Sequence, residues 1–235
     1  MTFLKARMSI GIVGAGAMGR VFARQLVKSG HVVTLANSRA PDSLLALATE
    51  VGAEVARVAD LATTCQVVFL AIPTKAVMAL PRRLFADAAR APVVIDVGNY
   101  HPELRDGRIE AIDRGLLDSQ WVAQQLQHPV IKAFNSILAT SLLAKACPKS
   151  TNDRIALPVA GDDDAAKATV LQLVDELGFD PVDAGSLDES WRQQTGAPAY
   201  CKDLPLAALE RALAQAERTR IGDYRAAREA ELRNS

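Results

Sequence analysis

The sequence predicts an α/β protein with a doubly wound, mostly parallel sheet and a helical extension at its C-terminal end. Two observations indicate this class. Short, continuous apolar runs alternate with segments of helical periodicity, as in parallel strands that are buried on both faces and joined by crossover helices. The first apolar run, 8–13, leads directly into a glycine-rich turn, Gly14-x-Gly16-x-x-Gly19, and a helical segment follows it to Ser29.

Each glycine of this turn has a physical role in a strand–turn–helix unit. Gly14 permits the tight turn, Gly16 lets a pyrophosphate approach the backbone, and Gly19 lets the helix pack closely on the strand. The helix N-terminus adds free N–H groups and the positive end of the helix dipole. A second strand expected at 31–36 supplies the context that separates this motif from a merely tight turn. We therefore predict a dinucleotide site formed by six contiguous residues: Gly14, Ala15, Gly16, Ala17, Met18 and Gly19.

The end of the second strand indicates which dinucleotide is bound. Sites for NAD place Asp or Glu about 20 residues after the glycines, where the carboxylate binds the ribose 2′-OH. This chain instead has Asn37, Ser38 and Arg39. A hydroxyl and a guanidinium suit a phosphate dianion, and no carboxylate repels it. The residues favour NADP(H); the alternative is that Arg39 is an ordinary solvated charge.

Length and composition limit the remaining function classes. The chain has 235 residues, enough for one large domain with a small annex, and we expect a nucleotide-binding reductase domain over 1–190 with a helical extension over 191–235. Its 27 basic and 27 acidic residues give no bulk field for nucleic acid or an anionic membrane. No apolar run approaches the roughly 20 residues of a membrane span. Three isolated cysteines suggest neither a disulfide framework nor a metal site, so we expect a cytoplasmic protein.

Further strands and helices are expected along the chain in alternation. The remaining strands are predicted at 53–56, 66–72, 92–97, 129–134, 155–161 and 179–185. Pro158 suggests an edge position or a bulge for the strand that contains it. Helices or helical turns are predicted after Pro41, from Asp60, and at 75–80, 119–126, 137–146, 165–177 and 205–232.

Polar residues are expected to cap two of these helices. Asn135 and Ser136 are predicted to cap the helix at 137–146. The acidic run 162–164 precedes the helix at 165–177, where acidic side chains are favourable, so we interpret it as a cap and not as a metal cluster. The charged segment 205–232 either caps the domain or binds a second subunit, which makes a homodimer one expected assembly.

Several blocks of the sequence resemble the F420-dependent NADP reductases and their bacterial relatives. The same type of domain forms the cytosolic reductase half of the STEAP metalloreductases. The resemblance runs from the glycine turn to about Tyr200. Its most specific parts are the late blocks at 132–135, 159–163 and 178–185, whereas the segment from Trp191 onward departs from the family pattern.

The resemblance implies a Rossmann-type domain that positions NADPH for hydride transfer to a deazaflavin such as F420, or to a flavin. Ser38 and Arg39 would bind the 2′-phosphate, and the glycine turn the pyrophosphate. Ligands of open α/β sheets bind beyond the carboxyl ends of the strands. Residues there would flank the nicotinamide and its ribose: Ala71, Ile72, Pro73, Gly98 and Asn99. Phe134, Asn135 and Gly161 would lie near the second ring.

Hydride transfer between two ring cofactors needs little acid–base help from the protein, because the cofactors carry the chemistry. This agrees with a sequence in which no catalytic constellation is evident. Of the three histidines only His101 is placed to approach a substrate, as a proton donor or as an ordinary loop histidine. We expect it among the substrate-binding residues.

Two rival interpretations remain open at this point. One is a β-hydroxyacid dehydrogenase or imine reductase; hydroxyacid dehydrogenases carry a catalytic Lys with an Asn four residues later. Here Lys167 is followed at that spacing by Leu171, and Lys132 and Asn135 are three residues apart. The other rival is an NADP-binding redox sensor or partner subunit without turnover, which the charged segment after Pro205 motivates.

Overall fold

A single parallel sheet organises the computed structural model, which describes residues 7–85 and 88–234. The strand order β3-β2-β1-β4-β5-β6 places the first strand at the centre, and all neighbouring strands pair in parallel. This confirms the predicted doubly wound sheet. The strands are β1 (Ser9–Val13), β2 (Val32–Ala36), β3 (Glu54–Val55), β4 (Val67–Leu70), β5 (Val93–Asp96) and β6 (Ile131–Lys132).

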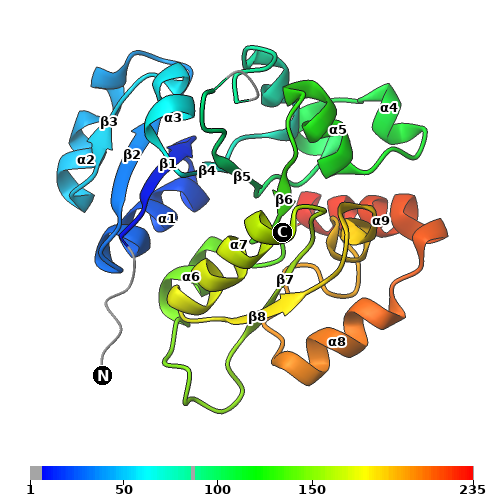
Figure 1. Ribbon diagram of the computed structural model, residues 1–235. Coiled ribbons are helices and arrows are strands. Elements are labelled where there is room, and N and C mark those ends of the chain that lie inside the picture. Colours follow the sequence, from blue (N-terminus) through cyan, green and yellow to red (C-terminus); the bar gives the residue numbers. More distant parts are fainter. Residues whose placement is uncertain (1–6, 86–87, 235) are drawn as a thin grey trace.

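Crossover helices connect the strands and cover the sheet on both faces (Figure 1). Most coincide with the predicted helical segments, although 74–79 is a 3-10 helix. The elements before β6 are α1 (Ala17–Lys28), η1 (Pro41–Leu44), α2 (Leu45–Val51), α3 (Val58–Thr64), η2 (Thr74–Ala79), η3 (Pro102–Asp106), α4 (Glu110–Asp113) and α5 (Asp118–Leu126). Those after β6 are α6 (Ala139–Ala144), α7 (Asp164–Glu176), η4 (Leu187–Gln193), α8 (Leu206–Gln215), η5 (Arg218–Arg220) and α9 (Ile221–Arg233).

The apolar core lies on both faces of the sheet. Side chains alternate along a strand, so Phe69 of β4 packs with Ile12 and Phe22 on one face, whereas Leu70 packs with Val13 on the other. Every residue of β4 is buried. Two-sided burial explains why this strand reads as an uninterrupted apolar run in the sequence.

The last two strands do not extend the main ladder. β7 (Ala156–Val159) and β8 (Asp180–Asp183) pair in parallel as a separate two-stranded sheet. A single antiparallel bridge between Lys132 and Ala160 connects this sheet to the end of β6. Pro158 therefore lies in a two-stranded sheet, in agreement with the predicted edge position.

Two predictions about helix ends are wrong and one is confirmed. The segment 205–232 is two helices, because Ala216 adopts an extended backbone that ends α8 before η5 and α9 begin. The residues Asn135 and Ser136 do not cap α6, whose N-cap is Leu138 and has no side-chain cap bond. Asp163 does cap α7, since its side chain accepts a bond from the Ala166 amide.

The C-terminal helices lie far from the first three strands, on the side of the molecule occupied by β6 and the small sheet (Figure 1). Residues 187–193 form the continuous 3-10 helix η4 across the predicted boundary at residue 190, so the division into 1–190 and 191–235 stays a prediction. Within the described residues, no helix combines the length and apolar character that crossing a membrane requires.

Candidate functional site

The glycine turn at the carboxyl end of β1 excludes side chains at two of its three glycines. Gly14 has a φ of +108°, and a Cβ there would lie 2.3 Å from the carbonyl oxygen of Ala71. A Cβ at Gly19 would lie 2.0 Å from the carbonyl oxygen of Gly14. At Gly16, in contrast, a Cβ would meet no atom within 4 Å. Gly14 and Gly19 are thus required by the fold itself, whereas Gly16 faces open space.

The first helix offers unpaired N–H groups to that open space. Gly16 is the N-cap of α1, no side chain caps the helix, and its first turn contains no acidic residue. The amides of a first helical turn have no partner within the helix and carry the positive end of its dipole. A diphosphate fits this position, because main-chain donors and room for its oxygens occur together.

A cavity of about 890 Å³ extends from this turn across the carboxyl ends of β2 and β4. Asn37 shapes its rim: its Oδ1 accepts a bond of 2.8 Å from the Arg39 amide, and its Nδ2 donates to Ser43 Oγ at 3.2 Å. We call this space the first cavity. Its walls are Val13, Gly14, Ala15, Gly16, Asn37, Ser38, Arg39, Arg57, Val58, Ala71, Ile72, Pro73, Ala76, Ala79, Leu80 and Pro81.

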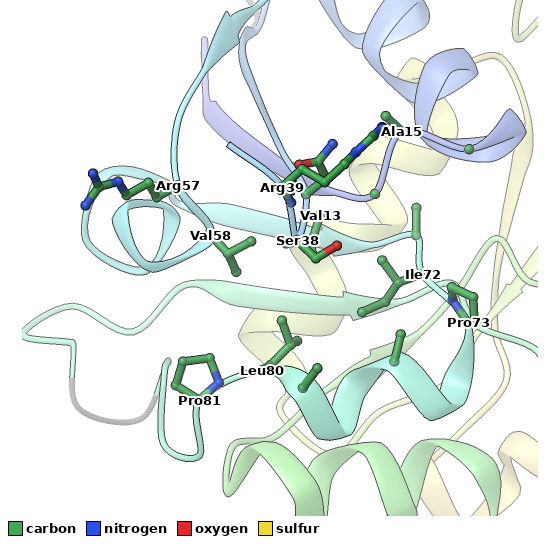
Figure 2. A pocket seen from close by; sticks show the side chains of 16 residues that line it. Val13, Ala15, Ser38, Arg39, Arg57, Val58, Ile72, Pro73, Leu80 and Pro81 are labelled. Atoms are coloured by element: carbon green, nitrogen blue, oxygen red, sulfur yellow. Dashed lines mark hydrogen bonds between the residues drawn. The ribbon is translucent and has the colours of Figure 1, made fainter. Parts of the chain in front are cut away.

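Two cations and no carboxylate occur among the described residues that line the first cavity. In Figure 2 the Arg39 side chain points toward Ala15 of the glycine turn, whereas Arg57 points away from the other labelled side chains. Ile72, Pro73 and Leu80 lie on the opposite, apolar wall. The cavity thus combines an apolar wall with a cationic rim at the place where a 2′-phosphate is predicted.

A second cavity, of about 410 Å³, adjoins the first. Both share Gly16 and the segment 71–73, which follows β4. The remaining walls of this second cavity come from α1, from the segment after β5 and from regions after β6: Ala17, Met18, Val97, Gly98, Asn99, His101, Arg105, Ile137, Leu138, Ala139, Tyr200 and Cys201. The two cavities are neighbouring chambers along the carboxyl edge of the sheet.

A buried ion pair fixes the segment after β5. Lys132 Nζ lies 3.0 Å from Asp96 Oδ2, and both side chains are almost inaccessible to solvent. Asp96 also accepts bonds from Ser119 Oγ at 2.7 Å and from the Gly98 amide at 2.8 Å. Lys132 further donates to the Gly98 carbonyl. The backbone of Gly98, in the wall of the second cavity, is therefore held from both its amide and its carbonyl.

Asn99 and Asn135 hold each other across the strand ends. Asn99 Nδ2 donates to the Asn135 carbonyl at 2.9 Å, and Asn135 Nδ2 donates to Asn99 Oδ1 at 3.1 Å and to the Gln193 carbonyl at 2.6 Å. Phe134 precedes this pair with a φ of +61°, and its ring packs between Phe22 and Phe69 in the core. The chain reversal at Phe134 therefore directs Asn135 toward Asn99.

The histidine of the second cavity is largely buried. His101 is 9% exposed, and burial together with the charge of Arg105 lowers its pKa to about 4. Its Nε2 lies 3.5 Å from the Tyr200 hydroxyl. Burial also raises the pKa of Tyr200, and it raises the pKa of the neighbouring Cys201 to about 11. At neutral pH these three groups are all uncharged.

The C-terminal helix α9 contacts the loop that carries His101. Glu229 Oε1 accepts a bond of 3.1 Å from the Glu103 amide and lies 3.9 Å from His101 Nδ1. One turn earlier, Arg225 pairs with the buried Asp118 at 3.3 Å and lies over the Tyr100 ring. Burial raises the pKa of Asp118. The wall of the second cavity thus depends on contacts with the last helix of the chain.

The structure brings most of the predicted site residues to the two cavities. All of the predicted cofactor-binding residues line them except Gly19, which lies behind the turn. His101 lines the second cavity. The side chains of Phe134 and Asn135 do not: Phe134 is fully buried in the core and Asn135 supports Asn99. Gly161 packs against Ile131, and a Cβ there would lie 2.3 Å from Ile131 Cδ1. The ligand contacts themselves stay predictions.

Several residues of the site escaped the sequence analysis. Arg57, Tyr200 and Cys201 line the cavities but are distant in sequence from every motif, and Arg105 lies in the loop four residues after the predicted His101. The Asp96–Lys132 pair did leave a signal, since each is a charged residue at the end of an otherwise apolar strand segment. Charged residues are almost never fully buried without a partner.

The parallel sheet and its crossover helices define a Rossmann-like fold of the NAD(P)-binding type. Residues 9–100 match the family model described as NADP oxidoreductase, coenzyme F420-dependent. The match covers 92 of the 235 residues, so this part of the chain is similar to the NADP-binding oxidoreductases of that family.

Two curated relatives match parts of the chain. The Escherichia coli K12 protein YjhV is 45% identical over 71 residues, which are 30% of this chain and 52% of YjhV. The rat metalloreductase STEAP3 is 29% identical over 184 residues, which are 78% of this chain and 35% of STEAP3. The chain thus spans about half or less of the length of these relatives.

Solved structures also match most of the chain. The Sinorhizobium meliloti protein SMa0349 is 26% identical with a TM-score of 0.72, and the match covers 87% of this chain and 98% of that one. An imine reductase from Pseudomonas sp. is 16% identical with a TM-score of 0.53, over 77% of this chain and 56% of its own. That second likeness shows a shared fold alone.

Proposed function

We propose that this protein transfers a hydride between NADP(H) in the first cavity and a deazaflavin or flavin ring in the second. The observation that carries the proposal is the shared wall: Gly16 and residues 71–73 border both cavities. Two ligands that meet at one wall can be held in the contact and orientation that direct hydride transfer needs. NADP(H), when bound, supplies or takes up the hydride.

The residues of the first cavity, together with Gly98 and Asn99 from the wall of the second, would bind the cofactor end to end. Main-chain donors at the start of α1 bind the diphosphate, and Gly16 lets its oxygens approach. Ser38 and Arg39 bind the 2′-phosphate, with Asn37 holding the turn that carries them. Ile72 and Pro73 support one side of the nicotinamide, and Gly98 and Asn99, fixed by Asp96 and Asn135, support the ribose side.

The second cavity favours a ring acceptor over a hydroxyacid substrate. A hydroxyacid dehydrogenase would need a catalytic lysine in this cavity. Neither Lys132 nor Lys167 is among the described residues that line it. Lys132 is buried against Asp96, and Lys167, on α7, pairs with Asp183 at 3.1 Å. The walls are instead formed by an amide, neutral aromatic groups, apolar side chains and Arg105, whose guanidinium is already paired with Asp106 at 3.0 Å. This lining suits a planar heterocycle. In this proposal the protein is a cytoplasmic reductase, and residues 191–235 complete its acceptor site. Its assembly as a homodimer stays a prediction.

The test is a screen of NADPH oxidation by the full chain. The acceptors are F420, FMN, FAD, ferric chelates and quinones, with NADH as the matched donor. We expect turnover with at least one ring acceptor and a preference for NADPH. Tight NADPH binding without turnover on any acceptor would contradict the proposal and favour a redox sensor.

A further inference from the structure

The second cavity contains a line of three proton-carrying side chains for which the motifs give no function. Tyr200 and His101 both line the cavity, with the Tyr200 hydroxyl 3.5 Å from His101 Nε2. On the other side of the imidazole, Nδ1 lies 3.9 Å from Glu229 Oε1. The order along the line is therefore hydroxyl, imidazole and carboxylate.

These three polar side chains are buried, which costs free energy unless they are hydrogen-bonded. Tyr200 is 8% exposed, His101 9% and Glu229 1%. His101 Nδ1 has no hydrogen-bond partner among the described residues, although it is buried. A buried polar atom left without a partner costs free energy comparable to a lost hydrogen bond. The Glu229 carboxylate is the nearest group that could accept a bond from this nitrogen.

The charges around His101 define its resting state. Arg105 and Asp106 belong to its own loop, and Arg225, Arg228 and Glu229 reach it from α9. Burial and the cations keep the ring neutral at neutral pH. With its proton on Nδ1, toward Glu229, the ring presents the Nε2 lone pair to the Tyr200 hydroxyl. Separations of 3.5–3.9 Å are usual for catalytic hydrogen bonds before a ligand binds, and they shorten in the complex.

We propose that Tyr200, His101 and Glu229 form a proton relay for the second cavity. The inference rests on the proposed function, since hydride transfer to or from a heterocycle is accompanied by one proton at a ring nitrogen. Tyr200 is the catalytic residue that touches the ring, whereas His101 and Glu229 act through it as positioning residues.

The relay balances as follows when a reduced ring gives its hydride to NADP⁺. The hydride and its electron pair leave a ring carbon, and the proton on the ring nitrogen goes to Tyr200 Oη. The hydroxyl proton of Tyr200 passes at the same time to His101 Nε2, so the phenol stays neutral. The imidazolium is stabilised by Glu229 and then loses a proton to water. Reduction of the ring by NADPH uses the same steps in reverse.

Tyr200→Phe tests the relay because it removes only the hydroxyl. The probe reaction is NADPH oxidation with FMN or F420, whichever gives the higher wild-type rate. We expect kcat to fall about 100-fold, the typical contribution of a positioned acid–base group, while the Kd for NADPH changes less than about twofold. Tyr224→Phe is the matched control. Together with Tyr200 and Cys201, Tyr224 lines a separate cavity of about 230 Å³, but it does not line the second cavity.

Glu229→Gln tests the positioning of the imidazole. It removes the negative charge but keeps an oxygen that can accept from the Glu103 amide. We expect a lower kcat with an unchanged KM for NADPH, and Glu231→Gln, on the exposed side of α9, is the control.

A readout that does not depend on turnover is the ¹⁵N NMR spectrum of the histidines. We expect the Nε2 signal of His101 to shift in Tyr200→Phe, and its tautomer populations to change in Glu229→Gln. Neither signal should move in the controls.

The outcomes separate this proposal from the proposed function. A wild-type protein that turns over a ring acceptor, together with Tyr200→Phe at more than half of that rate, overturns the relay and leaves the proposed function intact. Unchanged His101 signals in both variants also overturn it. No turnover with any acceptor overturns the proposed function and the relay together.

Discussion

The two cavities are built in different ways, although they share a wall. The first is lined by the glycine turn, by small and apolar side chains and by two arginines, all from the first 81 residues, and its key contacts come from one turn and one strand end. The second takes its walls from five separate regions between Gly16 and Cys201, and α9 supports it from outside. Its supporting polar groups are buried side chains, such as Asp96, Lys132 and Asn135.

The shape of the first cavity thus depends on the backbone of the glycine turn, whereas the shape of the second depends on hydrogen bonds and ion pairs between side chains. Backbone walls tolerate little change in volume, because atoms already touch where a Cβ would lie. Side-chain walls tolerate little change in charge, because each buried polar group needs its partner. Substitutions in the two regions should therefore fail for different reasons.

The largest loss is expected at the ion pair of the second cavity. Lys132→Met leaves the Asp96 carboxylate buried with two neutral donors, and breaking a buried pair in this way typically costs about 3–5 kcal/mol of unfolding free energy. Urea denaturation measures it. Lys145→Met is the control, because the Lys145–Asp203 pair is largely exposed and should contribute less than about 1 kcal/mol. Equal losses in the two variants would contradict the assigned importance of burial.

The turn of the first cavity should respond to volume. Gly19→Ala forces a Cβ against the Gly14 carbonyl and should destabilise the protein by about 3 kcal/mol. Gly16→Ala has room and should leave the unfolding free energy within about 1 kcal/mol, yet it should weaken NADPH binding by obstructing the diphosphate. Thermal denaturation and NADPH fluorescence distinguish the two. Full NADPH affinity in Gly16→Ala would place the diphosphate elsewhere.

Acid should destabilise the second cavity through His101. The pKa of this histidine is about 4 in the folded protein and about 6.5 in an unfolded chain. Below pH 6.5 the unfolded state therefore binds a proton that the folded state does not. The stabilisation present above pH 6.5 is lost as the pH falls toward 4, by up to about 3 kcal/mol. In His101→Gln this part of the pH dependence should disappear, which urea titrations at pH 7, 5.5 and 4.5 would reveal.

Arg39→Ala should change cofactor preference without changing the fold. Loss of a charged hydrogen bond to the 2′-phosphate should weaken NADPH by about 1.5–3 kcal/mol, roughly 10- to 150-fold, and leave NADH almost unaffected. Arg57→Ala should have a smaller effect, because that side chain points away from the glycine turn (Figure 2). Isothermal titration with both cofactors measures the difference. Equal weakening of NADPH and NADH in Arg39→Ala would refute the phosphate role.

The smallest effect is expected far from the shared wall. Gly222 lies in the first turn of α9, where a Cβ would meet nothing within 4 Å. Gly222→Ala should stabilise the protein by about 0.5 kcal/mol through helix propensity and leave the Kd for NADPH unchanged. A shift of that Kd would mean that α9 acts on the first cavity as well as the second.

The same contrast explains how much the sequence could predict. The doubly wound sheet and the first cavity could be predicted from the sequence, because Gly14, Gly19 and the end of β2 act through local backbone geometry. Residues that are adjacent in the sequence determine that geometry. Tyr200 and Glu229 could not be predicted as parts of a site. They are 99 and 128 residues from His101 in the sequence, and only the tertiary fold brings them close to it. The single helix predicted over 205–232 failed for a related reason: the composition around Ala216 favours a helix, and tertiary contacts override it.

The wall of Gly16 and residues 71–73 also has a thermodynamic consequence. A ligand in either cavity would contact this shared wall. Binding in one cavity would therefore affect binding in the other through the same few residues. At equilibrium, if the bound ring raises the affinity for the nucleotide by some factor, the bound nucleotide must raise the affinity for the ring by the same factor. Affinities measured singly and in pairs must therefore close a cycle, and that cycle gives the coupling free energy between the two ligands.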